Sequence, residues 1–245
     1  MPSHQLKAVF FDAAGTLFTV NGAVGEIYAR LAREHGKEIS AADLEVGFRR
    51  CFAQALAMAF PGAEPAHIPQ LEKQWWRNVV QSIFAPLGSF PEFDTYFEAL
   101  FTYFARAESW QLYSETLDTL TALQNRGVRL GIISNFDSRL FGLLEGLGIA
   151  GFFDSVTIST QAGSAKPAPE IFSQALAQHN LRPHEALHIG DSYEADVIGA
   201  QAIGLTPVFV DRDNHKRETV RYHTVKSLAE LPTLVDTYGT RNPSL

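Results

Sequence analysis

The chain has 245 residues, 46% of them hydrophobic and 19% charged, which suits a globular protein with one large core or two smaller ones. Its formal net charge of −7 argues against nucleic acid and anionic membrane as partners, because both require a basic surface. The single cysteine, Cys51, excludes a disulfide within the chain and fits a reducing compartment such as the cytoplasm.

The first predicted element is a buried strand over residues 7–12, in the stretch KAVFFDAAGTLF. Four apolar residues run into a lone Asp12, and the small residues 13–16 follow. A short apolar run with a glycine turn behind it is typical of a parallel strand buried on both faces. The carboxylate at its end is therefore a candidate functional group.

The next stretch, residues 23–107, is predicted to be almost entirely helical and to contain no strand. Ser40 is expected to cap a helix whose apolar residues recur every four positions as far as Phe60, where a Pro-Gly pair breaks the pattern. A second helix carries Trp75 and Trp76, which we expect to pack internally rather than to form an interface.

Beyond about residue 110 the pattern changes to alternating helices and strands. Helices are expected over residues 114–127, 137–148, 169–180 and 193–204, and strands over residues 128–134, 155–159, 186–190 and 206–210. Such alternation predicts right-handed crossovers and a parallel sheet covered on both faces. The fold class is therefore α/β, a doubly wound Rossmann-like sheet, and the first strand belongs to it by its apolar character.

The domain organisation follows from this division. We expect an α/β core of residues 1–17 and 108–238, a helical cap of residues 18–107 inserted after the first strand, and a disordered tail at 239–245. The longest basic run, residues 212–221, is interrupted by acids and is expected to be a solvated loop. No apolar run is long enough to cross a membrane, and no signal peptide is expected.

Polar residues follow four of the elements in the predicted sheet. They are Asp12, Ser134, Asn135, Lys166, Asp191 and, one helical turn further on, Asp196. Ligands of open parallel sheets bind beyond the carboxyl ends of the strands, so these side chains are expected to converge. Each residue alone is a common turn, cap or surface residue, and it is their order along the strands that carries the prediction.

The chemistry of this set indicates a phosphoryl group and a metal. Two carboxylates that meet repel each other unless a cation lies between them, and hard oxygen donors suit Mg²⁺. Ser134 and Lys166 offer a hydroxyl and an ammonium group to an anion, and an aspartate can attack phosphorus to give an aspartyl-phosphate. Gly15 and Thr16 are small enough for their backbone N–H groups to approach phosphate oxygens.

The motifs DAAGTL, ISN, KP and GDSYEAD, in this order, resemble those of the haloacid dehalogenase-like superfamily of hydrolases, which are mostly phosphatases. The paired tryptophans and the stretch SNFDSRL resemble one capped branch of it. The resemblance implies that Asp12 is the nucleophile and that Ser134 and Lys166 anchor the phosphate of a small phosphorylated substrate. It also implies Asp12, Asp191 and the Ala14 carbonyl as Mg²⁺ ligands, with Asp196 orienting Lys166 or a metal-bound water.

Ala14 departs from the phosphatase pattern, which has a second aspartate at this position. That acid protonates the leaving group and then activates water, and such general acid–base help contributes a factor of about 10²–10⁴ in rate. The backbone of Ala14 can still bind a metal, whereas its side chain cannot move a proton. We therefore expect a metal site that is intact and turnover that is weakened.

Other members of the superfamily supply alternatives. One is a pseudo-enzyme that binds phosphate and metal without turnover. Another is a phosphonatase-like C–P hydrolase, which shares D-x-A-G-T but needs a cap lysine, for which the chain offers only Lys37 and Lys73. A metal-free dehalogenase is disfavoured by Asp191, since those enzymes have no acid in the fourth motif.

Three histidines and one further aspartate are candidates to replace the missing acid. His35 and His67 in the predicted cap, and Asp137 beside the second motif, are expected to be structural or solvated. His188 precedes the fourth motif inside a strand, so we expect it to be a core histidine whose ring is hydrogen-bonded.

Overall fold

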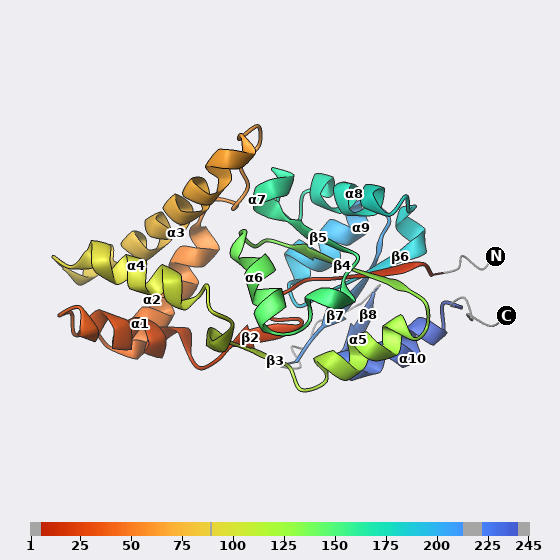
Figure 1. Cartoon of the computed structure of the whole chain (residues 1–245), viewed down its shortest axis with the longest axis horizontal. Coiled ribbons are helices and arrows are strands. Elements are labelled where there is room, and N and C mark those ends of the chain that lie inside the picture. Colours follow the sequence, from red (N-terminus) through yellow and green to blue (C-terminus); the bar gives the residue numbers. More distant parts are fainter. Residues whose placement is uncertain (1–5, 89, 213–221, 240–245) are drawn as a thin grey trace.

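A computed structural model describes residues 6–88, 90–212 and 222–239 (Figure 1). Residues 240–245 of the expected tail, and the whole of the basic run after Arg212, lie outside the described residues. Within the described ranges, no helix combines the length and the apolar character that crossing a bilayer requires.

Six parallel strands form the central sheet in the order β5-β4-β1-β6-β7-β8. They are β1 (Ala8–Phe11), β4 (Arg129–Ser134), β5 (Ser155–Ile158), β6 (Ala186–Gly190), β7 (Thr206–Val210) and β8 (His223–Val225). β1 lies between β4 and β6, with Phe11 opposite Ile132 on one side and Ile189 on the other. The predicted parallel α/β sheet is confirmed.

Helices cover both faces of this sheet. They are α5 (Thr116–Gln124), α6 (Arg139–Gly146), α7 (Ser159–Ala162), α8 (Pro169–Gln178), a π-helix (Tyr193–Ile198), α9 (Gly199–Ala202) and α10 (Leu231–Asp236). Val9 and Phe11 belong to one hydrophobic cluster, whereas Ala8 and Phe10 belong to another. This division follows from the strand geometry, because successive side chains point to opposite faces.

Short 3-10 turns connect several elements. They lie at Pro65–His67, Ala85–Leu87, Ala107–Ser109, Ala150–Phe152, Pro183–Glu185 and Leu228–Glu230.

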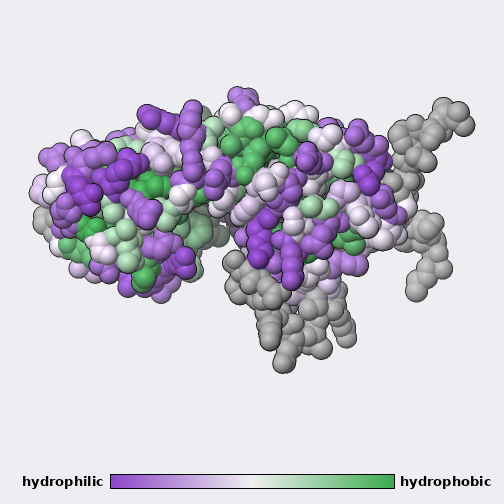
Figure 2. Space-filling view, turned by 90° about the horizontal axis from the view of Figure 1, so that it is seen from below, coloured by the Kyte–Doolittle hydropathy of each residue, from purple (hydrophilic) through white to green (hydrophobic). Residues whose placement is uncertain are grey.

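Four helices form a separate layer beside the sheet, which we call the helical segment, residues 24–103 (Figure 1). They are α1 (Val24–Glu34), α2 (Ala41–Gln54), α3 (Ile68–Phe84) and α4 (Phe93–Tyr103). They bury a hydrophobic cluster of their own around Tyr96 and Phe97. Trp75 and Trp76 pack against this cluster with ring centroids 4.9 Å apart, so the expected internal packing is confirmed. Figure 2 shows hydrophilic residues spread over both the helical segment and the sheet layer on the face that it displays.

The helix that begins after Ser40 is shorter than the sequence pattern indicates. The Ser40 hydroxyl accepts a hydrogen bond from the Asp43 N–H at 3.4 Å, which confirms the cap. The expectation that this helix reaches Phe60 is wrong, because α2 ends at Gln54 and Ala55 is extended, with φ −66° and ψ 147°. The Leu56 carbonyl instead accepts a hydrogen bond from the Trp75 indole at 2.8 Å, a tertiary contact that competes with helix continuation.

Apart from the 3-10 turns, five of the described elements were not predicted, and one of them is the four-residue helix α7 that follows β5. β2 (Phe18–Val20) and β3 (Trp110–Leu112) form an antiparallel pair at the two ends of the helical segment, although residues 18–20 were assigned to the helical cap. β8 and α10 follow the last predicted strand. All of these strands are three residues long, too short for a period-two pattern to stand out in the sequence.

Candidate active site

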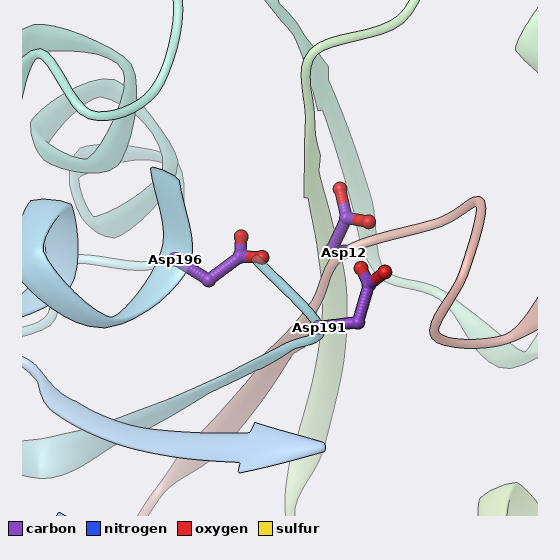
Figure 3. A group of neighbouring side chains, drawn as sticks. All are labelled: Asp12, Asp191 and Asp196. Carbon is purple, nitrogen blue, oxygen red and sulfur yellow. The ribbon is translucent and has the colours of Figure 1, made fainter. Parts of the chain in front are cut away.

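The predicted polar residues meet at one edge of the sheet, where all of them line a single cavity. They are Asp12 after β1, Ser134 and Asn135 at the end of β4, Lys166 before α8, Asp191 after β6, and Asp196 in the π-helix. Carboxylate oxygens of Asp12, Asp191 and Asp196 all lie within 4.8 Å of one another (Figure 3). The expected convergence of these distant segments is therefore observed.

Lys166 joins two of the carboxylates. Its Nζ lies 2.7 Å from Asp12 Oδ1 and 2.6 Å from Asp196 Oδ1, and the residue is only 5% exposed. The Ser134 hydroxyl donates to the same Asp12 oxygen at 3.0 Å. Among the described residues, the structure gives no hydrogen bond to the other Asp12 oxygen, which leaves that oxygen available to a cation or an incoming group.

Asn135 was predicted to bind substrate, and the structure engages its side chain elsewhere. Its Oδ1 accepts a hydrogen bond from the Lys166 backbone N–H at 2.7 Å, and its Nδ2 donates to the Lys166 carbonyl at 2.8 Å. Both ends of the amide are thus used to fix the backbone of Lys166. The geometry supports a positioning function for Asn135 in place of the predicted contact with substrate.

Asp196 is held from three directions. Its Oδ1 accepts from Lys166 and lies 2.8 Å from His188 Nε2, and its Oδ2 accepts from the Ser192 backbone N–H at 2.9 Å. Burial lowers the pKa of His188 despite the neighbouring carboxylate, so the ring is neutral and Nε2 carries the proton that it donates. His188 is thus a buried, hydrogen-bonded core histidine, as expected, although its Nδ1 has no partner among the described residues.

Gly15 and Thr16 were predicted to present backbone N–H groups to phosphate, whereas the structure shows both N–H groups donating within the turn. The Gly15 N–H donates to the Phe18 carbonyl at 2.8 Å and the Thr16 N–H to the Ala13 carbonyl at 3.3 Å, so both serve the turn. Neither residue lines the cavity. Both act on Asp191 instead: the Thr16 hydroxyl donates to its Oδ1 at 3.3 Å, and a Cβ on Gly15 would lie 2.3 Å from its Oδ2.

The carboxylates carry an excess of negative charge. The pKa of Asp191 is raised to about 7, first by removal from water and then by the charges of Asp12 and Asp196. Burial likewise raises the pKa of Asp12, and Lys166 opposes that rise. Burial works against the Lys166 charge, but the two carboxylates outweigh it and raise the pKa of Lys166. Three acids thus face one ammonium group, an arrangement that a divalent cation would neutralise.

The cavity has a volume of about 400 Å³ and lies between the sheet edge and the helical segment. The sheet contributes the polar groups described above, together with Ala14. The helical segment contributes aromatic and aliphatic side chains, such as Tyr28, Phe48 and Phe101, none of which was predicted as a site residue. They come from different helices, and only the packing of those helices brings them together.

Arg139 also lines the cavity and was not predicted, although it stands in the stretch SNFDSRL directly after the second motif. Its Nε and Nη2 donate to the two oxygens of the Asp137 carboxylate at 2.9 and 2.6 Å. The Trp76 indole donates to the same carboxylate at 2.6 Å. Asp137 is fully buried in these contacts, which agrees with the expected structural role.

The two lysines considered for Schiff-base chemistry do not line the cavity. The Lys37 ammonium donates to the Leu87 carbonyl at 2.8 Å, and Lys73 forms an ion pair with Glu98 at 2.6 Å.

A parallel sheet with carboxylates, a hydroxyl and an ammonium group at its strand ends defines a hydrolase of the haloacid dehalogenase type. The chain belongs to the haloacid dehalogenase-like hydrolase family, whose model matches residues 6–204. It is 36% identical to the human haloacid dehalogenase-like hydrolase domain-containing protein 3, over 98% of each chain. This is the branch that the paired tryptophans and SNFDSRL indicated.

Two further comparisons place the chain among its relatives. A ribulose-1,5-bisphosphate 5-phosphatase of Halopiger xanaduensis is 34% identical over 54% of this chain and 59% of its own length. The crystal structure of the HAD-hydrolase YfnB from Bacillus subtilis, bound to magnesium, matches with a TM-score of 0.73. That match covers 95% of this chain and 99% of the other at 19% identity, so it supports a shared fold and nothing more specific.

Proposed function

We propose that this protein is a Mg²⁺-dependent phosphatase that acts on small organophosphates through Asp12. The observation that carries the proposal is the position of the Asp12 carboxylate in the cavity. One of its oxygens is fixed by Ser134 and Lys166, and Asp191 lies beside it. A buried nucleophile with a hydroxyl and an ammonium group at hand is suited to a phosphoryl group.

The residues have distinct functions in the proposed reaction. An Asp12 oxygen gives its electron pair to phosphorus, the ester P–O bond breaks, and the alcohol leaves with a proton taken from water. Ser134 and Lys166 hold the phosphoryl oxygens, and Asp196 with Asn135 keeps Lys166 in place. Water then attacks phosphorus and releases Asp12 and inorganic phosphate.

The donor set fits Mg²⁺. Asp12, Asp191 and the backbone carbonyl of Ala14 are hard oxygen ligands. Asp12 and Asp196 share the single ammonium group of Lys166, and Asp191 has no ion pair among the described residues. Asp196 is already committed to Lys166, His188 and Ser192, which favours Asp12 and Asp191 as the carboxylate ligands. When bound, the ion would offset the charge of the phosphoryl group.

A phosphate-binding protein without turnover is the second candidate, and Ala14 is the observation that favours it. Ala14 lines the cavity beside Asp12, and its methyl group cannot donate a proton to the leaving alcohol. A phosphonatase-like reaction has less support, because neither Lys37 nor Lys73 lines the cavity.

An assay with 4-nitrophenyl phosphate tests the proposal. We expect turnover that needs Mg²⁺, stops with a chelator and is lost in Asp12→Asn. Asp118→Asn, an exposed residue of α5, is the matched control and keeps the wild-type rate. Full activity in Asp12→Asn contradicts the nucleophile. Mg²⁺-dependent binding of beryllofluoride without any turnover would favour the binding protein.

A further inference from the structure

The cavity has two chemically different sides. The sheet side carries the charged groups of the candidate active site. The side formed by the helical segment is lined, within the described residues, by no charged side chain, and its members are aliphatic or aromatic. Val24, Phe97, Leu100 and Phe48 are representative of them. A ligand with its phosphoryl group at Asp12 would therefore place the rest of its body against an apolar wall.

Few polar atoms are available on that wall. In the described part of the helical segment, Tyr28 and Trp76 are the lining residues whose side chains carry a nitrogen or an oxygen. The Trp76 indole N–H is already donated to Asp137 at 2.6 Å. Among the described residues, the Tyr28 hydroxyl makes no hydrogen bond, so it is the single hydrogen-bonding group of the helical segment left to a ligand.

Arg139 of α6 also lines the cavity, and its positive charge is already paired with the Asp137 carboxylate. Arg139 donates from two nitrogens to the Asp137 carboxylate and from a third to the Phe101 carbonyl at 3.2 Å. Its guanidinium carbon also lies 4.1 Å from the centre of the Phe101 ring. A second anionic group on the substrate would consequently find no free countercharge on this side.

We propose that the substrate is a phosphate monoester of an uncharged, largely apolar alcohol, with at most one hydrogen-bonding group, opposite Tyr28. This inference rests on the proposed phosphatase function and adds the class of leaving group. A sugar or polyol would bury several hydroxyls without partners, and each unpaired hydroxyl lowers kcat/KM by roughly tenfold to a hundredfold. The volume of about 400 Å³ lies at the lower end of the range for small-molecule sites and accommodates a short chain or a small ring system.

Esters of matched leaving-group chemistry test the inference. Benzyl and n-hexyl phosphate are compared with glucose 6-phosphate and glycerol 3-phosphate, all of which release a primary alcohol. We expect kcat/KM to be at least tenfold higher for the two apolar esters. Equal or faster hydrolysis of the polyol esters overturns the inference and leaves the phosphatase function standing.

Binding of stable phosphonates separates the two proposals. With Mg²⁺ present, we expect benzylphosphonate to bind at least tenfold more tightly than 2,3-dihydroxypropylphosphonate by calorimetry. This selectivity without turnover of any ester would support the apolar site and contradict the phosphatase function. The absence of selectivity would overturn the apolar site.

Two variants with the same valine-to-threonine change test whether the apolar wall is the part of the cavity that selects the ligand. Val24→Thr places a hydroxyl on the apolar wall at nearly constant volume, and Val46→Thr makes the same change at an exposed position of α2 that does not line the cavity. We expect Val24→Thr to weaken benzylphosphonate binding several-fold, with inhibition by inorganic phosphate unchanged, and Val46→Thr to change neither. Unaltered benzylphosphonate binding in Val24→Thr overturns the assignment of this wall.

Discussion

The Glu72 carboxylate of α3 accepts a hydrogen bond from the Thr160 hydroxyl of α7 at 2.6 Å, across the boundary between the helical segment and the sheet layer. The same oxygen accepts from the backbone N–H and the hydroxyl of Ser138, at 3.0 and 2.8 Å. Glu72 is only 3% exposed. One buried carboxylate oxygen thus fixes the helical segment to α7 and to the residue that precedes α6.

Removal of this acceptor is expected to loosen the boundary. Glu72→Ala leaves buried donors without a partner, which costs about 1–3 kcal/mol of unfolding free energy. Glu72→Gln retains an oxygen at the same position and is expected to lose much less. Denaturant unfolding measures both variants. Equal stability of Glu72→Ala and the wild type would contradict this account of the contact.

A second prediction concerns Gly15, which has φ +90° and whose Cβ would lie 2.3 Å from Asp191 Oδ2. Gly22 is a matched control, since it has φ +100° and nothing within 4 Å of its Cβ position. We expect either Gly→Ala change to lower stability by about 1 kcal/mol through backbone strain. We expect Mg²⁺ to raise the melting temperature of the wild type through the proposed site, and only Gly15→Ala should displace Asp191 and abolish that rise. A full Mg²⁺ response in Gly15→Ala would refute the steric argument.

A third prediction concerns the missing acid. Ala14→Asp is expected to raise turnover of an alkyl phosphate by a factor of up to about 10²–10⁴, because it supplies a proton to a poor leaving group. The gain should be smaller for 4-nitrophenyl phosphate, whose leaving group needs no proton. Ala14→Asn has nearly the same shape without the acid and serves as the control. If the aspartate variant is no faster than the asparagine variant, the absence of a proton donor at position 14 does not limit the turnover rate.

A fourth prediction concerns pH. Arg212 Nη1 lies 2.7 Å from Glu115 Oε1, and although burial opposes ionisation, the hydrogen bond and charge of Arg212 lower the pKa of Glu115 from 4.5 to about 2. A lowered folded-state pKa gives stability that is present above pH 4.5 and is lost as the pH falls towards 2. Glu115→Gln should therefore be less stable than the wild type at pH 7, by about 1 kcal/mol, since the pair is partly screened by solvent.

The measurement is the unfolding free energy of both proteins across the acid range. The gap between them should narrow below pH 4.5. If the difference in unfolding free energy between the two proteins stays constant from pH 7 to pH 3, the Arg212–Glu115 ion pair is not its source.

The polar residues of the candidate active site were predictable because most of them lie at, or a short way beyond, the carboxyl end of a strand of the sheet. Asp12 and Asp191 end adjacent strands, so their meeting follows from topology alone. The effect of Gly15 on Asp191 was not predictable, because it depends on a close approach between segments far apart in the chain. The end of α2 was missed for the same reason, since a distant indole binds the Leu56 carbonyl.

The residues that form the apolar wall of the cavity could not be predicted from the sequence either. A helix such as α4 has apolar residues on more than one side, and Phe97 both packs in the cluster of the helical segment and lines the cavity. Periodicity indicates that such a residue is buried, whereas the packing of several helices decides what it is buried against. Strand ends have no such ambiguity in a parallel sheet.

The pairing of β2 with β3 sets Val20 opposite Trp110, so the chain leaves and rejoins the sheet layer at neighbouring positions. The Asn21 N–H also donates to the Ser109 carbonyl at 2.8 Å, which continues the pairing outward. A short turn between these two strands would close the chain with the entire helical segment excised. The apolar wall and the strand-end polar groups therefore lie on separate stretches of the chain, and a different helical insert grafted at this junction would face the same strand-end side chains.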